Sequence, residues 1–280
     1  MTSTNKENSP FGRAISALYD LTGFVDVRMA GISFVQFRPE LEKFVSTTEQ
    51  KQLKDSSELS SVVQSNQQFA QRQFEQGFPY LFGFAALRLY SILEIFVEDF
   101  VLRLIENNQS IGEMPIIRKL QGPLVEFLQS SSARRAELLF NLLISDLNVP
   151  LKAGVGRYEA VFNAIGLGGP VDEGVKKVLL ELSEVRNVIA HRNGIIDAKF
   201  LRNCPWFKAN LGDTIRQTHL QFRTYFNAIL WYFYKIHRRE NIVYPTEETA
   251  KGVSVEELVA AQERQIQRIR STIVTREPDN

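Results

Sequence analysis

GFPYLFGFAALRLYSILEIFV, residues 77–97, is an apolar run of 21 residues with only two charges. That length is close to what is needed to cross about 30 Å of hydrocarbon. Its polar side chains continue in the same helical pattern beyond the run: Arg88, Ser91, Glu94, Glu98, Asp99 and Arg103. At 100° per residue they fall within about half of the helical circumference. Since a charge at mid-bilayer costs about 2.5 to 3.5 kcal/mol, the pattern predicts a buried helix with one polar side, from about Pro79 to Glu106, and no membrane span.

The rest of the composition is that of a soluble globular protein. Of the 280 residues, 44% are hydrophobic and 23% are charged, which excludes the disordered, collagen-like and disulfide-stapled classes. The net charge of +1 provides no global attraction to nucleic acid or to an anionic membrane, so a nucleic-acid site must be local. One cysteine, Cys204, permits no internal disulfide, and three histidines provide no ligand cluster for a structural zinc. We therefore expect a cytoplasmic protein that needs no metal or cofactor.

Apolar periodicity indicates helices nearly throughout the chain, so the predicted fold class is all-α. Upstream of the apolar run we expect a short helix over Arg13 to Leu21 and a long, polar, solvated one from Pro39 to about Phe74. Downstream we expect five helices: Ile116 to Gln129, Ala133 to Leu147, Tyr158 to Ile165, Val171 to about Ala190, and Asp213 to about Arg239. The predicted organisation is a disordered tail (1–10), an N-terminal helical arm (11–76), a helical bundle (77–245) and a C-terminal helix and tail (246–280).

Local signals predict several helix ends. The serine run 130–132 can cap the helix after it, and Asp213 or Thr214 can cap the long helix near the C-terminus. Ser254 and Glu257 form a capping box for a final helix.

ELSEVRNVIAHRNGIID, residues 181–197, is the stretch whose side chains are most suited to catalysis. It places Arg186 and Asn187 within an otherwise apolar-periodic helix and His191 at its end. Positions five apart on a helix differ by about 140° in direction and 7.5 Å in rise, so we expect Arg186 and His191 on two walls of a groove. The Asn193-Gly194 pair is the expected left-handed C-cap.

This motif resembles the Arg-x(4-6)-His signature of HEPN domains. The resemblance rests on RNVIAH at 186–191, on the turn HRNGIID that includes His191, and on the apolar helix about a hundred residues upstream; it covers roughly Pro79 to Arg239. It implies a four- to five-helix bundle with extra N-terminal and C-terminal helices, and a metal-independent endoribonuclease that acts as a homodimer. Glu94 is the position that resembles the acidic residue that the family places beside the motif helix.

The roles implied by the resemblance agree with the chemistry of these side chains. RNA supplies its own nucleophile, the 2′-hydroxyl, so the protein needs only a proton-transfer group and positive charge. His191 would move the proton, Arg186 would donate two hydrogen bonds to phosphate oxygens, and Asn187 would orient the phosphate. The expected partners are RNA, a second copy of the chain, and an antitoxin or regulatory protein, as in a toxin or defence effector.

The alternative is a non-catalytic helical interaction module that binds a protein partner or a nucleotide. An Arg and a His at a helix end are more often structural than catalytic. We expect His219 and His237 to pack or to face solvent, and Cys204 to be a core thiol. The glycine-rich stretch 166–170 lacks both the Lys-Ser/Thr of a Walker loop and the spacing of a dinucleotide site. We interpret it as a turn between helices.

Overall fold

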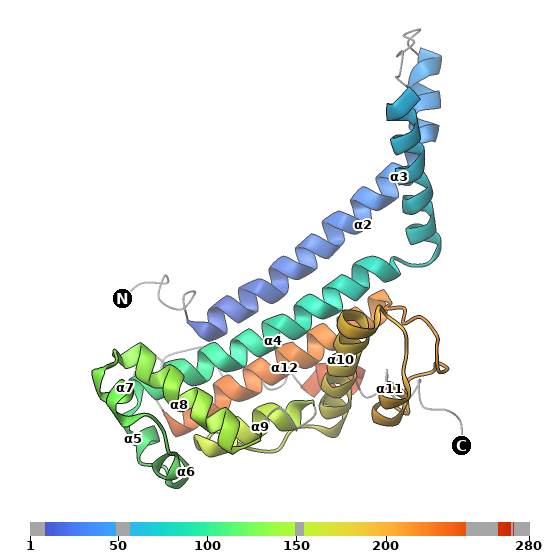
Figure 1. The fold of residues 1–280 in the computed structure, drawn as a ribbon. Helices are drawn as coiled ribbons and strands as arrows, with labels where there is room; N and C mark the ends of the chain where they lie inside the picture. Colours follow the sequence, from blue (N-terminus) through green and yellow to red (C-terminus); the bar gives the residue numbers. More distant parts are fainter. Residues whose placement is uncertain (1–8, 49–56, 149–153, 245–262, 270, 272–280) are drawn as a thin grey trace.

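The structure, a computed structural model, describes residues 9–48, 57–148, 154–244, 263–269 and 271. In these ranges the secondary structure is helical apart from one isolated β-bridge (Figure 1). The helices are α2 (Pro10–Thr48), α3 (Ser57–Glu75), α4 (Pro79–Asn107), α5 (Gln109–Gly112), α6 (Pro115–Lys119), α7 (Leu124–Gln129), α8 (Ser132–Asp146), α9 (Val155–Ala164), α10 (Glu173–Arg192), α11 (Ala198–Asn203) and α12 (His219–Val243). Residues 263–269 are also helical, and Ile269 there is buried. The all-α class predicted from the sequence is confirmed.

Helix α4 is the central helix of the bundle. It contacts α2, α8, α10 and α12 (Figure 1). By length and composition it could cross a membrane, yet 56% of its most apolar window is buried inside the protein. Each polar side chain predicted to share one face, from Arg88 to Arg103, is exposed or partly exposed. This is the distribution of a core helix with one polar side.

Aromatic side chains join α4 to the helices around it. The Phe96 ring lies 4.0 Å from the Phe233 ring of α12, and the Phe100 ring lies 6.1 Å from the Phe162 ring of α9. Full burial of such a side chain stabilises the fold by about 1.5 to 3 kcal/mol. On α12 the buried side chains include Tyr225, Ile229, Phe233 and Ile236, whereas Leu220 in its first turn is 58% exposed.

The N-terminal helices differ from the sequence prediction. Instead of a helix over Arg13 to Leu21 and a second beginning at Pro39, α2 continues from Pro10 to Thr48 without interruption. Its buried residues are Ala14, Leu18, Leu21 and Val25. Their spacing of four, three and four residues forms one helical stripe, and this stripe packs the first half of α2 on the bundle. The second half lies beside α3 and extends away from the bundle (Figure 1).

Some predicted helix ends are correct and others are wrong. Ser131 caps α8 by accepting a 3.3 Å hydrogen bond from the Arg134 amide. The predicted helix over Ile116 to Gln129 is two short helices, because the backbone is extended at Leu120 and at Pro123. The stretch 166–170 is a turn between α9 and α10, as predicted. Ser254 and Glu257 lie outside the described residues.

The start of α12 is also displaced from its prediction. The helix begins at His219, where Thr218 and Gln221 form a capping box. Asp213 and Thr214 belong to a preceding turn, in which Thr214 pairs with Ile195 in an isolated antiparallel bridge. Both predicted caps were therefore wrong, because the two residues are held by the segment after α10 and not by α12.

Candidate functional site

Helix α10 carries the predicted motif and ends two residues later than predicted. Asp172 caps its start by accepting hydrogen bonds from the Gly174 and Val175 amides. At the other end Asn193 has a φ of 51°, and the Gly194 amide donates a 3.0 Å hydrogen bond to the Val188 carbonyl. This is the left-handed termination predicted for Asn193 and Gly194, and it places His191 in the last turn of the helix.

The turn after α10 is fixed against the segment before α12. The Ile196 amide donates to the Asp213 carbonyl at 2.9 Å, and the Ile215 amide donates to the Gly194 carbonyl at 2.7 Å. Gly194 has a φ of +79°, a conformation that residues with a Cβ rarely adopt. Residues 195–197 connect this turn to α11, which begins at Ala198. The end of the motif helix is thus held by backbone hydrogen bonds on both sides.

Arg186, Asn187 and His191 meet around one guanidinium nitrogen. Arg186 Nη1 lies 3.1 Å from His191 Nε2 and donates a 3.2 Å hydrogen bond to Asn187 Oδ1. The prediction that Arg186 and His191 would face each other from two walls of a groove is wrong, because the long arginine side chain reaches along the last turn. A guanidinium has donors only, so a hydrogen bond in this contact requires His191 Nε2 to accept and the ring proton to be on Nδ1.

The other face of Arg186 lies on Tyr90 of α4. The guanidinium carbon is 5.4 Å from the centre of the Tyr90 ring, within the range of a cation–π contact. Tyr90 is only 5% exposed, so it holds the guanidinium against a rigid surface. The two helices pack closely nearby, where a Cβ added to Gly83 would meet Ile189 Cδ1 at 3.7 Å. Arg186 and Asn187 are half-buried, whereas His191 is exposed.

Glu94, which the resemblance placed beside the motif helix, pairs with Arg157 of α9 instead. Its Oε1 accepts a hydrogen bond from Arg157 Nη1 at 3.3 Å. Arg157 also donates to the Tyr90 hydroxyl at 3.1 Å. Glu94 is therefore linked to Arg186 through Arg157 and Tyr90 and not directly.

Tyr158, next to Arg157 on α9, is buried beside this cluster. Burial raises the pKa of the Tyr158 hydroxyl; the neighbouring Tyr90 hydroxyl and the Glu94 charge raise it further, and Arg157 acts in the opposite direction. The hydroxyl stays protonated at neutral pH and cannot serve as a proton acceptor. Of the side chains in this cluster, His191 is the exposed one, and the ring nitrogen that could accept a proton contacts Arg186.

Tyr90 and Arg157 are members of the cluster that the sequence analysis missed. Tyr90 had a detectable signal, because Tyr90 and Glu94 are four residues apart and share one face of α4. Arg157 had none. It lies at the start of a short helix, and only tertiary packing brings it to Tyr90.

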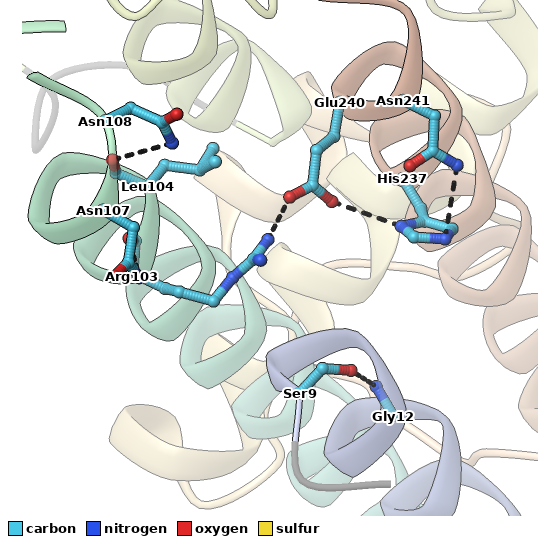
Figure 2. A network of polar contacts seen from close by, with 9 residues as sticks. All are labelled: Ser9, Gly12, Arg103, Leu104, Asn107, Asn108, His237, Glu240 and Asn241. Carbon is cyan, nitrogen blue, oxygen red and sulfur yellow. Dashed lines mark hydrogen bonds and ion pairs between the residues drawn. The ribbon is translucent and has the colours of Figure 1, made fainter. Parts of the chain in front are cut away.

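The remaining histidines have other environments. Figure 2 shows His237 Nδ1 next to Glu240, 3.2 Å away, and Glu240 also accepts from Arg103 of α4. The Phe11 ring stacks on His237 at 4.3 Å. This network fastens the start of α2 to α4 and α12, so His237 is a packing residue, as predicted. The exposed His219 lies beside the Phe82 ring.

The carboxylates of the motif helix that precede Arg186 are structural. Glu181 is 1% exposed and accepts hydrogen bonds of 2.7 Å from Trp206 Nε1 and from the Tyr225 hydroxyl. Glu184 accepts from Asn203. Burial, followed by the charges of these two glutamates, raises the pKa of the Cys204 thiol. Cys204 is thus the core thiol that we predicted.

Two cavities lie along α4, and neither includes a motif residue. One, of about 710 Å³, is lined by Arg13, Asp99 and Arg103 among others, and one, of about 540 Å³, by Phe24, Leu81 and Phe84. In the described part of the chain no group of three or more His, Cys, Asp or Glu side chains converges to hold a metal ion. The motif thus lies outside both of these cavities.

Comparisons with known proteins identify no relative. No protein-family model matches the chain, and no curated protein or solved structure matches it either.

Proposed function

We propose that the chain is a metal-independent endoribonuclease of the HEPN type, which cleaves RNA through the 2′-hydroxyl of the RNA itself. The observation that carries the proposal is the 3.1 Å contact between Arg186 Nη1 and His191 Nε2. It pairs a phosphate-binding cation with an imidazole, and these are the two groups that such a reaction requires. Both belong to one helix end that backbone hydrogen bonds keep in place.

The reaction follows from these two groups. When Arg186 turns its donors to a phosphate of the bound RNA, His191 Nε2 is released and can accept the proton of the 2′-hydroxyl. The 2′-oxygen forms a bond to phosphorus while the bond from phosphorus to the 5′-oxygen breaks, and the leaving oxygen takes a proton from solvent. The products are a 2′,3′-cyclic phosphate and a 5′-hydroxyl, and His191 returns its proton to solvent. Asn187 holds Arg186 between turnovers.

The test is the digestion of total RNA in the presence of EDTA. The wild-type chain should cut RNA to fragments with cyclic phosphate ends, and His191→Ala should not. Arg72→Ala, which removes an exposed arginine of α3, is the matched control for Arg186→Ala. Wild-type protein that leaves RNA intact with and without divalent ions would refute the proposal.

The proposed setting is a cytoplasmic toxin or defence effector whose activity a regulatory protein restrains. Expression of the chain by itself should then slow growth, and His191→Ala should remove the effect.

A second candidate function, that of a helical interaction module, is favoured by an aromatic face on α3 and α4. Its rings contact each other in sequence, Phe69 to Tyr80 at 6.3 Å and Tyr80 to Phe84 at 4.9 Å. All three remain exposed, by 42%, 61% and 55% respectively. Contiguous exposed apolar surface of this kind marks an interaction site.

We propose that a second copy of the chain covers the aromatic face. The adjoining cavity of about 540 Å³ contains both Asp20 and Arg88 in its lining. Opposite charges within one patch allow a two-fold arrangement in which Asp20 of each copy faces Arg88 of the other. The homodimer would then form through α2 and α4, and catalysis and self-association would use different surfaces.

A further inference from the structure

Two arginines from different helices are fixed to a single tyrosine. The Arg186 guanidinium lies over the Tyr90 ring at 5.4 Å, and Arg157 Nη1 donates to the Tyr90 hydroxyl at 3.1 Å. Because Tyr90 is buried in the core helix, both guanidinium groups lie against one fixed side chain. The cluster therefore holds two guanidinium groups. Arg186 belongs to the motif, and Arg157 has no role in the proposed function so far.

The hydrogen bonds of the two arginines follow the same pattern. Arg157 uses Nη1 for both Tyr90 and Glu94, and Arg186 uses Nη1 for both Asn187 and His191. Within the described residues, neither arginine donates a hydrogen bond from Nη2 or Nε. The edge formed by Nη2 and Nε is one that binds two oxygens of a phosphate in parallel. Each arginine thus has an edge that can bind a phosphate in addition to the nitrogen that holds it in the cluster, and when Arg186 binds a phosphate its Nη1 leaves His191 Nε2, as the proposed reaction requires.

The geometry points to Arg157 as a second phosphate-binding residue, so that the site holds two phosphates of one single-stranded RNA. This inference rests on the proposed function, in which Arg186 binds the phosphate that reacts. Arg157 then binds a neighbouring phosphate and positions the strand without taking part in the proton transfer. The substrate is a polynucleotide, because a substrate with one phosphodiester can occupy only one of the two arginines.

Glu94 limits this second contact. Its carboxylate lies 3.3 Å from Arg157, and the two side chains are 35% and 34% exposed. A phosphate that approaches Arg157 must displace this carboxylate or share the guanidinium with it. Removal of the Glu94 charge should therefore strengthen the binding of RNA, although removal of the Arg157 charge should weaken it.

The experiment compares a uridine trinucleotide, which has two phosphodiesters, with a dinucleotide, which has one. Arg157→Gln should raise the KM for the trinucleotide by about 10- to 100-fold, the range of a hydrogen bond to a charged group. It should leave kcat unchanged, because the lost contact binds the substrate and the transition state equally. It should also leave cleavage of the dinucleotide unchanged. Glu94→Gln should lower the KM for the trinucleotide.

Fluorescence anisotropy with His191→Ala provides a readout that does not need cleavage. Adding Arg157→Gln to this variant should weaken trinucleotide binding and reduce the slope of log K against log salt by about 0.7, the value for one phosphate of a single strand. Arg157→Lys should restore the salt slope but not the full affinity. A purely structural Arg157 would not change the salt slope.

The outcomes separate the two proposals. If the wild-type chain cleaves both substrates and Arg157→Gln changes neither, or changes both equally, Arg157 does not bind a second phosphate. If the chain binds the trinucleotide with the Arg157 dependence but cleaves nothing, the proposed ribonuclease activity fails and the two-phosphate site stands. If it neither binds nor cleaves, both fail.

Discussion

Arg186 Nη1 lies 3.1 Å from His191 Nε2, although the two residues are five positions apart on α10. Their directions from the helix axis differ by about 140°. The two side chains still meet, because the arginine side chain is long and His191 lies in the last turn of the helix, two residues before left-handed Asn193. One protomer thus contains an assembled pair. A second copy is not needed to complete the pair, and the case for a dimer rests on the aromatic face.

His191→Ala and Arg186→Ala should each reduce RNA cleavage by about 10²- to 10⁴-fold, the range for loss of a positioned proton-transfer group. The fold should survive, because His191 is exposed and Arg186 is only half-buried. Cleavage assays in EDTA together with thermal unfolding check both statements. A variant that lost activity only because it melted would contradict the catalytic assignment.

Glu94→Ala should lower the free energy of unfolding by no more than about 1 kcal/mol. Its ion pair with Arg157 is about one third exposed on both sides, and such pairs contribute little because water screens them. Urea unfolding of Glu94→Ala and Glu94→Gln measures the effect. A loss of several kcal/mol would mean that the pair is shielded from solvent.

Glu181→Ala should be far more destabilising, by about 3 to 5 kcal/mol. It removes two hydrogen bonds to a buried carboxylate and leaves the Trp206 and Tyr225 donors without that acceptor, and a hydrogen bond to a charged group contributes about 1.5 to 3 kcal/mol. Denaturant unfolding and a red shift of tryptophan emission report the change. Glu173→Ala, at an exposed position of the same helix, should be nearly neutral.

Glu240 should make stability depend on pH in the acidic range. Burial by itself would raise the pKa of its carboxyl, but the hydrogen bond with His237 and the Arg103 charge together lower the pKa below its usual value. A lowered folded-state pKa gives stability that is present above the unfolded pKa of about 4.3 and is lost as the pH falls through the folded value. The free energy of unfolding of the wild type should therefore exceed that of Glu240→Gln by about 1.5 to 3 kcal/mol at pH 6.

This difference should shrink as the pH falls from 5 to 3, measured by urea unfolding at each pH. Glu98→Gln, at an exposed position of α4, is the control. A difference between wild type and Glu240→Gln that stayed constant down to pH 3 would show that the charge of Glu240 is not the cause.

Tyr80→Ser combined with Phe84→Ser should convert a dimer to a monomer while RNA cleavage persists at high protein concentration. Both side chains are more than half exposed, so their loss costs the monomer little. Sedimentation velocity at micromolar concentration provides the measurement. A wild-type chain that is monomeric throughout this range would exclude the second copy as the partner of the aromatic face.

Regular local patterns were enough to predict the helical class and several of its details. The apolar run at 77–97 with its one-sided charges predicted the core helix α4, and Asn193 with Gly194 predicted the end of α10. Ser131 capped α8 as expected. These features depend on hydrogen bonds and side-chain periodicity within a few residues, so the sequence contains all the information that they need.

The length of α2 and the start of α12 were decided by tertiary structure. The single α2 was missed because its described buried residues, Ala14 to Val25, end well before the helix does, and its second half lies beside α3 and not on the bundle. Thr218 rather than Asp213 caps α12 because the bridge from Ile195 to Thr214 holds the preceding turn.

The sequence by itself determined that Arg186, Asn187 and His191 share one helix end. Only the tertiary structure decided what surrounds them, because α4 and α9 bring Tyr90 and Arg157 to that end from positions that are distant in the chain. Glu94 pairs with Arg157 for the same reason. Contacts within a helix follow from the spacing of residues, whereas the partner of a side chain that leaves its helix depends on how the helices pack.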